Sequence, residues 1–288
     1  MLLVFGSSCG RPGVEKVSIK GSDTEVNLVL QLAETFMKDD PDVSIAVTGG
    51  GSGAGISALL NGKADIANSS RPFKSAEIEI ASGREIDAKA IIFAIDALVL
   101  VVNPATRMDT LSLAQVGAIF RGDFQNWSDL GGPNMPISLY GRQSNSGTFV
   151  FFREHILRDE YSQDIKQMNG TAQIIEAVKS DPAAIGYVGI GYVVNKVGEV
   201  MEGIGVVKIQ TDSSQAALNP VEKKHIISGA YPITRPLFQY VNGQASGKLL
   251  EFIRFELSSA GQRIVQENGY FPISSQQAQH NQSILPGL

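Results

Sequence analysis

The sequence predicts an α/β fold with two lobes, and three observations lead to this expectation. Over residues 17–68, stretches typical of strands alternate with helical stretches across short loops, which indicates a parallel sheet. An apolar run at residues 93–103, interrupted by Asp96, suits a strand that crosses from one lobe to the other. With 288 residues, the chain is long enough for two hydrophobic cores.

The first strand and helix are expected within residues 17–37. Residues 17–20 are predicted to form a strand, and apolar residues then recur at helical spacing from Val26 to Met37. Ser22 and Glu25 precede that helix at the spacing of a capping box, in which each side chain bonds the backbone of the other. We therefore expect these two residues to mark the start of the helix.

Two more strands and a short helix complete the first parallel sheet. The strands are expected at residues 43–47 and 64–68, and the helix at 56–60, ahead of the stop signal Asn61-Gly62. In parallel sheets, ligands collect beyond the carboxyl ends of the strands. Hydroxyl-bearing residues follow these ends at Thr24, Ser52 and Ser70. We expect the three side chains to converge.

The next part of the chain is expected to build the second lobe. Beyond the crossing strand, we predict strands at residues 136–140 and 185–189 and helices at 113–120, 149–157 and 171–179.

The chain is then expected to return to the first lobe near residues 231–233. Helices are predicted at 247–257 and 259–268, and the Gln/Ser-rich segment from Ser274 is expected to be a strap or a disordered tail. We assign residues 17–95 and 235–288 to lobe 1, residues 96–234 to lobe 2, and residues 1–16 to a signal remnant and linker.

A candidate anion site lies at residues 141–148, between a predicted strand and a predicted helix. The first backbone N–H groups of a helix lack intrahelical partners and carry partial positive charge. A glycine there lets an oxyanion approach the backbone, and Arg142 adds a bidentate donor. Alone, the stretch would fit an N-cap at Ser146 and a solvated Arg142. A second such stretch, the glycine-rich residues 49–55, favours anion binding.

Charge and composition narrow the classes of function. The net charge of -5 argues against a nucleic-acid partner, which would need a basic face. It does not exclude a small anion, because local dipoles and one arginine act at close range while distant surface charge is screened. No His/Cys/Asp cluster has the spacing of metal ligands, so neither a metal nor a cofactor is expected.

The only cysteine, Cys9, excludes an intrachain disulfide. Residues 2–10 look like the end of a bacterial lipoprotein signal, although the apolar run is short and lacks a basic start. We expect a truncated or mis-started signal peptide in which Cys9 takes the lipid and provides the only membrane attachment. The alternative is an N-terminal remnant with an incidental thiol.

Over about residues 17–271, the chain resembles the PstS family of periplasmic phosphate-binding proteins of ABC transporters. The resemblance rests on Gly21-Ser22-Asp23-Thr24, Gly50-Gly51-Ser52-Gly53, residues 65–71, and Gly141-Arg142 with Ser146-Gly147-Thr148. It implies a type II periplasmic-binding fold, with two α/β lobes, two crossover strands and the ligand in the cleft. It also implies a monomer outside the cytoplasm that delivers inorganic phosphate to ABC permease subunits and is not an enzyme.

The resemblance also implies roles for single residues. Thr24 and Glu25 would supply backbone or hydroxyl donors, and Ser52 and Ser70 would donate from the same lobe. From the other lobe, Arg142 would supply the charge, and Ser146, Gly147 and Thr148 would close onto the anion. The second-tier candidates are Asp23, Arg71 and Asn145, and Arg71 fits a structural ion pair equally well.

Two departures from the longer family members concern selectivity. At the position of Ser70, those members carry an aspartate that accepts the proton of phosphate. They carry a second aspartate at the position of Ser144. Asp23 and Glu25 are the carboxylates that remain near the predicted site. We expect one of them to accept the proton and to favour phosphate over sulfate.

Other functions fit the sequence less well. Ser52 and Ser146 lack the flanking glycines of a hydrolase nucleophile elbow, and His155, His225 and His280 stand in no motif. The glycine stretch at residues 49–55 has neither the Gly-Lys-Ser/Thr of a P-loop nor, at its strand end, the Gly-x-Gly-x-x-Gly spacing of a dinucleotide-binding loop, so nucleotide binding is not expected. Two alternatives remain open, namely the same fold binding sulfate, molybdate or another oxyanion, and a phosphate sensor or adhesin without a transporter.

Overall fold

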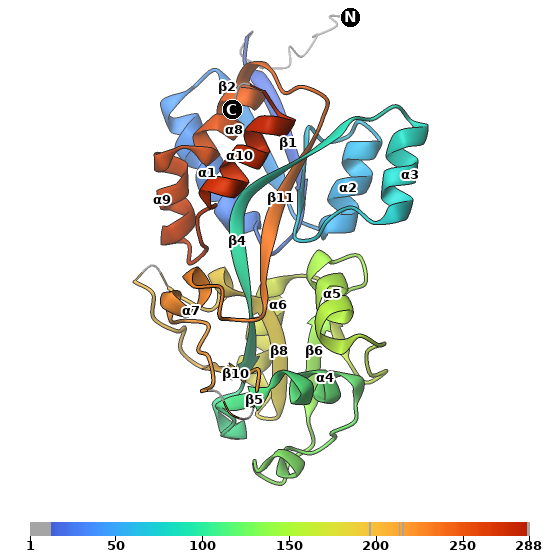
Figure 1. Ribbon diagram of the computed structural model, residues 1–288, viewed down its shortest axis with the longest axis vertical. Coiled ribbons are helices and arrows are strands. Elements are labelled where there is room, and N and C mark those ends of the chain that lie inside the picture. Colours follow the sequence, from blue (N-terminus) through green and yellow to red (C-terminus); the bar gives the residue numbers. More distant parts are fainter. Residues whose placement is uncertain (1–12, 196, 213, 215, 287–288) are drawn as a thin grey trace, which may run out of the picture.

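The computed structural model describes residues 13–195, 197–212, 214 and 216–286. Cys9 and most of the expected signal remnant lie outside this range. Two α/β lobes are stacked along the long axis of the molecule, and strands β4 and β11 run side by side between them (Figure 1). The predicted two-lobe α/β fold is therefore confirmed.

The first lobe contains the predicted parallel sheet. Its elements are β1 (Glu15–Gly21), α1 (Val26–Asp39), β2 (Val43–Thr48), α2 (Ser52–Leu60), β3 (Ile66–Ser69) and α3 (Ser75–Gly83). Strand β1 pairs in parallel with both β2 and β3. Two boundaries differ from expectation, because β1 begins at Glu15 rather than Val17 and α2 begins at Ser52 rather than Ile56.

The predicted capping box at Ser22 and Glu25 is wrong. Helix α1 begins one turn later than that pattern requires, so Glu25 itself is the N-cap residue and makes no capping bond with its side chain. The backbone N–H of Ser22 donates instead to the carbonyl of Asn68 on the neighbouring strand. The segment between β1 and α1 therefore remains non-helical and places Asp23 and Thr24 at the end of the sheet.

Two antiparallel strands connect the lobes. Strand β4 (Ala88–Val102) starts five residues before the predicted crossing strand and pairs along its first part with β11 (Thr234–Asn242). Its second part pairs with β8 (Ala184–Gly189) in the second lobe. Strand β11 also pairs with β3 in the first lobe, so the chain returns to that lobe within a strand.

The second lobe continues the sheet from β8 through β6 (Ser138–Arg142) to β7 (Lys166–Met168), all parallel. Its main helices are α4 (Leu113–Arg121), α5 (Gly147–Phe152) and α6 (Thr171–Ser180). Shorter elements are β5 (Thr110–Ser112), β9 (Gly205–Val206), β10 (Lys208–Gln210) and α7 (Lys223–Ile227). Helix α5 is six residues long and passes into a π-helical turn, Arg153–Leu157. Strand β6 therefore leads directly into the loop and helix that carry the Arg142 stretch.

Two main hydrophobic clusters form the cores. One gathers residues of β1, α1, β11 and α8 in the first lobe, and the other gathers residues of β4, α4, α6 and β8 in the second. A smaller cluster packs α2 against the first-lobe sheet. In the second core, the fully buried Trp127 donates its indole N–H to the carbonyl of Ala183. Each lobe thus carries its own support for the residues at its inner edge.

The expected strap or disordered tail from Ser274 is wrong, because the segment forms a helix. Helices α8 (Gly247–Leu257) and α9 (Ser259–Glu267) match the prediction, and α10 (Ser275–Ile284) follows them. Ser274 and Gln277 form a capping box at its start. The buried Asn281 donates to the carbonyl of Ile92 and accepts from its N–H, which fixes α10 to β4. No helix in the described ranges is long and apolar enough to cross a membrane.

Candidate anion-binding site

Hydroxyl-bearing residues from both lobes meet at the carboxyl ends of the first-lobe strands, as expected for Thr24, Ser52 and Ser70. The hydroxyl oxygens of Thr24 and Thr148 are 2.8 Å apart, although they belong to different lobes. Ser52 Oγ lies 3.5 Å from Ser70 Oγ and accepts from the Ser70 N–H. A Cβ at Gly147 would collide with both serine hydroxyls, so only glycine fits there. We call these residues, together with Arg142, the interlobe site.

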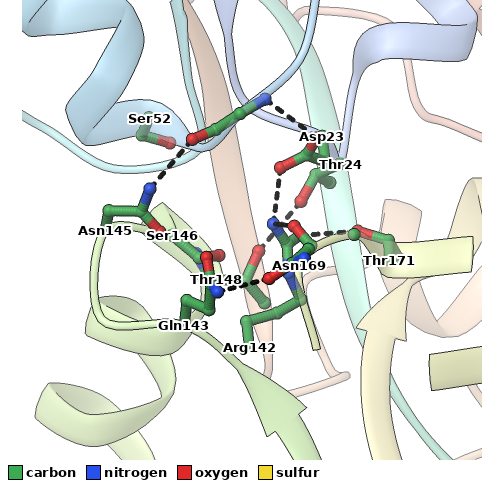
Figure 2. A network of polar contacts seen from close by, with 12 residues as sticks. Asp23, Thr24, Ser52, Arg142, Gln143, Asn145, Ser146, Thr148, Asn169 and Thr171 are labelled. Atoms are coloured by element: carbon green, nitrogen blue, oxygen red, sulfur yellow. Dashed lines mark hydrogen bonds and ion pairs between the residues drawn. The ribbon is translucent and has the colours of Figure 1, made fainter. Parts of the chain in front are cut away.

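Arg142 is 2% exposed, so it is not a solvated surface charge. Its guanidinium donates to Thr171 Oγ1 at 2.9 Å and to the carbonyls of Asn169 and Met168 in the same lobe. Nη2 also forms an ion pair of 2.5 Å with Asp23 of the first lobe (Figure 2). These contacts fix the arginine at the end of β6 and direct its charge at the other lobe.

Asp23 and Asn145 make further contacts beside the interlobe site (Figure 2). Asp23 Oδ1 accepts from the Gly50 N–H at 3.0 Å, and the Asp23 backbone carbonyl accepts from the Tyr192 hydroxyl. The Asn145 side-chain amide donates to the Gly50 carbonyl at 3.0 Å, and the Asn145 backbone carbonyl accepts from the Gly53 N–H. The two predicted anion-site stretches, residues 49–55 and 141–148, therefore lie against each other.

The glycine stretch needs its glycines for this approach. Gly50 and Gly51 have φ values of +115° and +91°, which other residues rarely adopt. A Cβ on Gly51 would also press against the carbonyl of Asn145. Helix α2 starts directly after this turn, at the fully buried Ser52, so its first N–H groups point toward the interlobe site. Ser146 caps α5 by accepting from the Thr148 N–H.

Arg71 does not join the interlobe site. Its guanidinium forms two hydrogen bonds of 2.7 Å with the Glu77 carboxylate at the start of α3. This ion pair and the bond to Lys74 N–H hold the pKa of Glu77 below its usual range, although burial opposes the shift. The structural role that the sequence left open for Arg71 therefore has direct support, and a ligand role has none.

Glu25 follows Thr24 directly, but its side chain is buried in the first lobe. Neither carboxyl oxygen has a hydrogen-bond partner among the described residues. Burial raises the pKa of Glu25 well above its usual range, and the neighbouring Asp96 and Glu256 add to the rise. Ser22 and Arg235 oppose the shift in pKa without reversing it. Burial therefore favours the protonated form of this side chain, and only the backbone of Glu25 remains a candidate donor to an anion.

Glu25 belongs to a wider set of buried polar side chains, which we call the acid–amide cluster: Glu25, Asn68, Gln239 and Glu256. All four side chains are at most 1% exposed, and each has at least one oxygen without a partner in the described part of the chain. Gln239 donates to Glu256 and stands opposite Asn68 in the β3–β11 pair. Burial raises the pKa of Glu256 well above its usual range.

A second buried arginine, Arg235, was missed in the sequence. It is 3% exposed, pairs with the fully buried Asp96, and donates to the hydroxyls of Thr24 and Thr148. One signal could have found it. Asp96 interrupts an apolar strand, and a buried charge needs a partner. Arg235 is the only Lys or Arg in residues 225–247 and lies where the chain returns to the first lobe.

The histidines are not arranged for nucleophilic catalysis. His155 Nδ1 contacts the carbonyl of Phe151, and His225 Nδ1 contacts the carbonyl of Asn219. Within the described residues, no histidine bonds to Ser52 or Ser146. The geometry supports an anion held by donors and gives no base for a serine nucleophile.

Comparison with known proteins identifies the family. Residues 6–260 match the model of a PBP superfamily domain. The chain is 32% identical to the phosphate-binding protein PstS of Pseudomonas aeruginosa over 286 residues, which cover 91% of this chain and 84% of that protein. The chain belongs to the PstS family. The Bacillus subtilis PstS is 30% identical and is covered to 91%, with 94% of this chain aligned.

Solved structures of PstS-like proteins have the same fold. A putative phosphate ABC transporter substrate-binding protein from Clostridium perfringens, with bound phosphate, superposes with a TM-score of 0.79 at 26% identity. An ABC-type phosphate transport receptor from Vibrio cholerae has a TM-score of 0.69 at 25% identity. Each alignment covers 90% of this chain and 100% of the other. The type II fold expected from the resemblance is thus confirmed.

Proposed function

We propose that this protein captures inorganic phosphate between its two lobes and delivers it to the permease subunits of an ABC transporter. The observation that carries the proposal is the convergence of donors from both lobes on one buried location. Thr24, Ser52 and Ser70 come from the first lobe, and Arg142, Gly147 and Thr148 come from the second. The protein acts by binding, with no catalytic step and no cofactor.

Each group of residues has a distinct task in phosphate binding. Arg142 supplies charge-assisted hydrogen bonding to the anion, which is about twice as strong as hydrogen bonding between neutral groups. Ser52, at the start of α2, and the backbone near Glu25, at the start of α1, donate where helix N-termini favour an anion. Ser70, Ser146 and Thr148 add hydroxyl donors, and Gly147 lets the backbone approach the anion.

Asp23 is our candidate for the group that accepts the phosphate proton. Near pH 7, phosphate carries at least one P–OH hydrogen and sulfate carries none, so a nearby carboxylate favours phosphate. Asp23 faces Arg142 across the lobes, whereas the Glu25 side chain is fully buried in the first lobe, where burial disfavours its charged form. Of the two carboxylates expected from the sequence, Asp23 therefore fits the task.

Binding is coupled to closure of the lobes. The contacts of Asn145 with Gly50 and Gly53, and of Asp23 with Arg142, form only when the lobes meet. Because donors to the anion also come from both lobes, the anion and these contacts stabilise the same closed form. We expect small-angle scattering to show a less compact protein after phosphate is removed than when phosphate is bound.

We further propose that the protein works outside the cytoplasm as a monomer and that Cys9 carries a lipid anchor. The location outside the cytoplasm is supported by the similarity to a phosphate-binding protein PstS and to an ABC-type phosphate transport receptor. A receptor that serves uptake has to bind the anion before the anion crosses the membrane. The lipid assignment rests on the sequence around Cys9 alone. Mass spectrometry of the mature protein, with Cys9→Ser as control, tests it.

Calorimetry of the anion-stripped protein with phosphate and with sulfate tests the function. We expect saturable binding of phosphate and much weaker binding of sulfate. Equal affinity for both anions would contradict selectivity for phosphate, and absence of phosphate binding would overturn the proposed function. Asp23→Asn should narrow the phosphate-over-sulfate ratio, and Glu25→Gln should leave it unchanged.

A further inference from the structure

Arg235 and Asp96 form a buried ion pair at the point where the chain crosses between the lobes. They stand directly opposite each other in the β4–β11 pair. Arg235 Nε and Nη2 donate to Asp96 Oδ2 at 3.1 and 2.9 Å. Asp96 Oδ1 accepts from the Ile190 N–H at 3.1 Å, and Arg235 Nη1 points to the Ser70 carbonyl at 3.4 Å. The guanidinium is therefore fixed by both crossover strands.

The same guanidinium reaches one hydroxyl of each lobe. Nη2 donates to Thr148 Oγ1 at 3.0 Å and to Thr24 Oγ1 at 3.3 Å. The Arg235 guanidinium also lies 5.3 Å from the ring centroid of Phe151 in α5, a cation–π contact with the second lobe. Arg235 thus touches both lobes from the strand that joins them.

The number of hydroxyl hydrogens decides what this arrangement does. Arginine can only donate, and one of the two Nη2 hydrogens goes to Asp96 Oδ2, so the two threonine oxygens share the other hydrogen as acceptors. Each hydroxyl has one hydrogen, and the oxygens lie 2.8 Å apart, so one threonine donates to the other. The threonine that accepts this bond still has its own hydroxyl hydrogen, which is free to be donated to a third group. The neighbouring groups at that location are those of the interlobe site.

We propose that Arg235, held by Asp96, is a positioning residue that presets Thr24 and Thr148 as donors to the bound anion. The inference rests on the proposed function. Because Asp96 balances its charge, Arg235 acts by orienting hydroxyls and adds little net charge. Since one threonine comes from each lobe, the arrangement is complete only in the closed form. A lysine would keep the charge but lose the planar set of donors.

A double-mutant cycle tests the proposal. Arg235→Lys and Thr148→Val are made singly and together, and phosphate affinity is measured by calorimetry. We expect each single variant to bind roughly tenfold more weakly, and the double variant to bind little worse than either single variant, because both changes disable the same donor. Additive losses, or normal binding by Arg235→Lys, would overturn the proposal.

Arg71→Lys is the matched control for a purely structural effect. Arg71 is also buried and paired with a carboxylate, but it lies outside the interlobe site. It should show a similar loss of thermal stability with unchanged phosphate affinity. Arg235→Lys should also weaken phosphate and sulfate by the same factor, because hydroxyl donors serve both anions. A loss of affinity that Arg71→Lys reproduces would overturn the assignment.

Should Arg235→Lys fail to fold, Thr24→Val and Thr148→Val provide a second cycle. Each hydroxyl orients the other, so either change should disable the same donor, as in the first cycle. The double variant should therefore bind phosphate little worse than either single variant, and additive losses would contradict the proposal. Failure of the wild-type protein to bind phosphate would instead reject the proposed function.

Discussion

Carboxyl groups border the interlobe site and also lie within the acid–amide cluster, but the structure treats the charges of the two sets in opposite ways. At the interlobe site, Asp23 and Asp96 are paired with arginines. In the acid–amide cluster, Glu256 accepts from the amide of Gln239, and both Glu25 and Glu256 have carboxyl oxygens without partners in the described chain. Burial raises the pKa of Asp96 from its ordinary value, but Arg235 and two backbone N–H groups oppose the rise.

The difference shows what decides whether a buried acid keeps its charge. Desolvation acts on both regions, and a nearby cation with direct hydrogen bonds is the term that counteracts it. Where that partner is present, the charge is available to orient ligands and hold the lobes. Where it is absent, burial raises the pKa of the carboxyl group and favours its protonated form. We therefore expect the interlobe site to respond to anions and the acid–amide cluster to respond to pH.

Removal of the partner of Arg235 should have the largest effect. Asp96→Ala leaves a buried guanidinium unpaired, which should lower the free energy of unfolding by about 3–5 kcal/mol in denaturant titrations without phosphate. Asp123→Ala breaks the exposed pair with Arg121 and should cost less than about 1 kcal/mol. Equal effects of the two changes would show that the buried pair is not structurally required.

Loss of the Arg142 side chain should weaken phosphate binding more than it lowers stability. Arg142→Ala should weaken phosphate binding by about 2–5 kcal/mol, because it removes a charge-assisted donor and leaves Asp23 unpaired. Arg142→Lys should restore part of the affinity, since an ammonium lacks the planar fork. Calorimetry measures both, with Arg121→Ala as a surface control. Wild-type affinity in Arg142→Ala would remove Arg142 from the site.

The acid–amide cluster should make stability depend on pH. A glutamate whose pKa is raised on folding stabilises the fold fully below its unfolded pKa, about 4.3, and this contribution is lost as pH rises through the raised folded pKa. The free energy of unfolding should therefore fall toward alkaline pH, by up to about 1.4 kcal/mol per pH unit for each such group.

Glu256→Gln sharpens this comparison, because glutamine cannot ionise. The variant should show a shallower fall in unfolding free energy with rising pH than the wild type. Glu251→Gln, at a half-exposed position on the same helix, should retain the wild-type slope. An unchanged slope in Glu256→Gln would mean that Glu256 does not take up a proton on folding.

The smallest effect is expected at the rim of the interlobe site. Asn145→Ala removes the side-chain bond to the Gly50 carbonyl and should weaken phosphate binding by about 0.5–1.5 kcal/mol, because the closed form loses one contact. Ser144→Ala, at the adjacent exposed position, should have no measurable effect. A loss in the serine variant equal to that in Asn145→Ala would assign the effect to the loop as a whole.

Local patterns predicted much of the fold. Periodic apolar spacing located α1, the predicted helices at 247–257 and 259–268 correspond to α8 and α9, and strand–helix alternation predicted the parallel arrangement of β1, β2 and β3. Helix α10 could not be found in this way, because its Gln/Ser composition has no apolar stripe. It is held by the Ser274 cap and by the bonds of Asn281 to a distant strand.

The site was predictable to the extent that it follows strand ends. Thr24, Ser52 and Ser70 gather because parallel strands end at one edge, and Arg142 follows β6. The pairing of Asp23 with Arg142 depends on how the two lobes meet, and the pairing of Arg235 with Asp96 depends on the register of the two crossover strands. No local pattern encodes either of them. The direction of the Glu25 side chain likewise depends on where α1 begins.

The pairing of β11 with β3 has a consequence for the order of folding. Ser69 pairs with Phe238, so the first-lobe sheet joins segments from the two ends of the chain. The second-lobe pairs β4–β8 and β6–β8 lie within one continuous stretch. Contacts between distant segments form slowly, because a long loop must be closed first. During synthesis the second lobe can therefore assemble first, while the first lobe must wait for the last fifth of the chain to emerge.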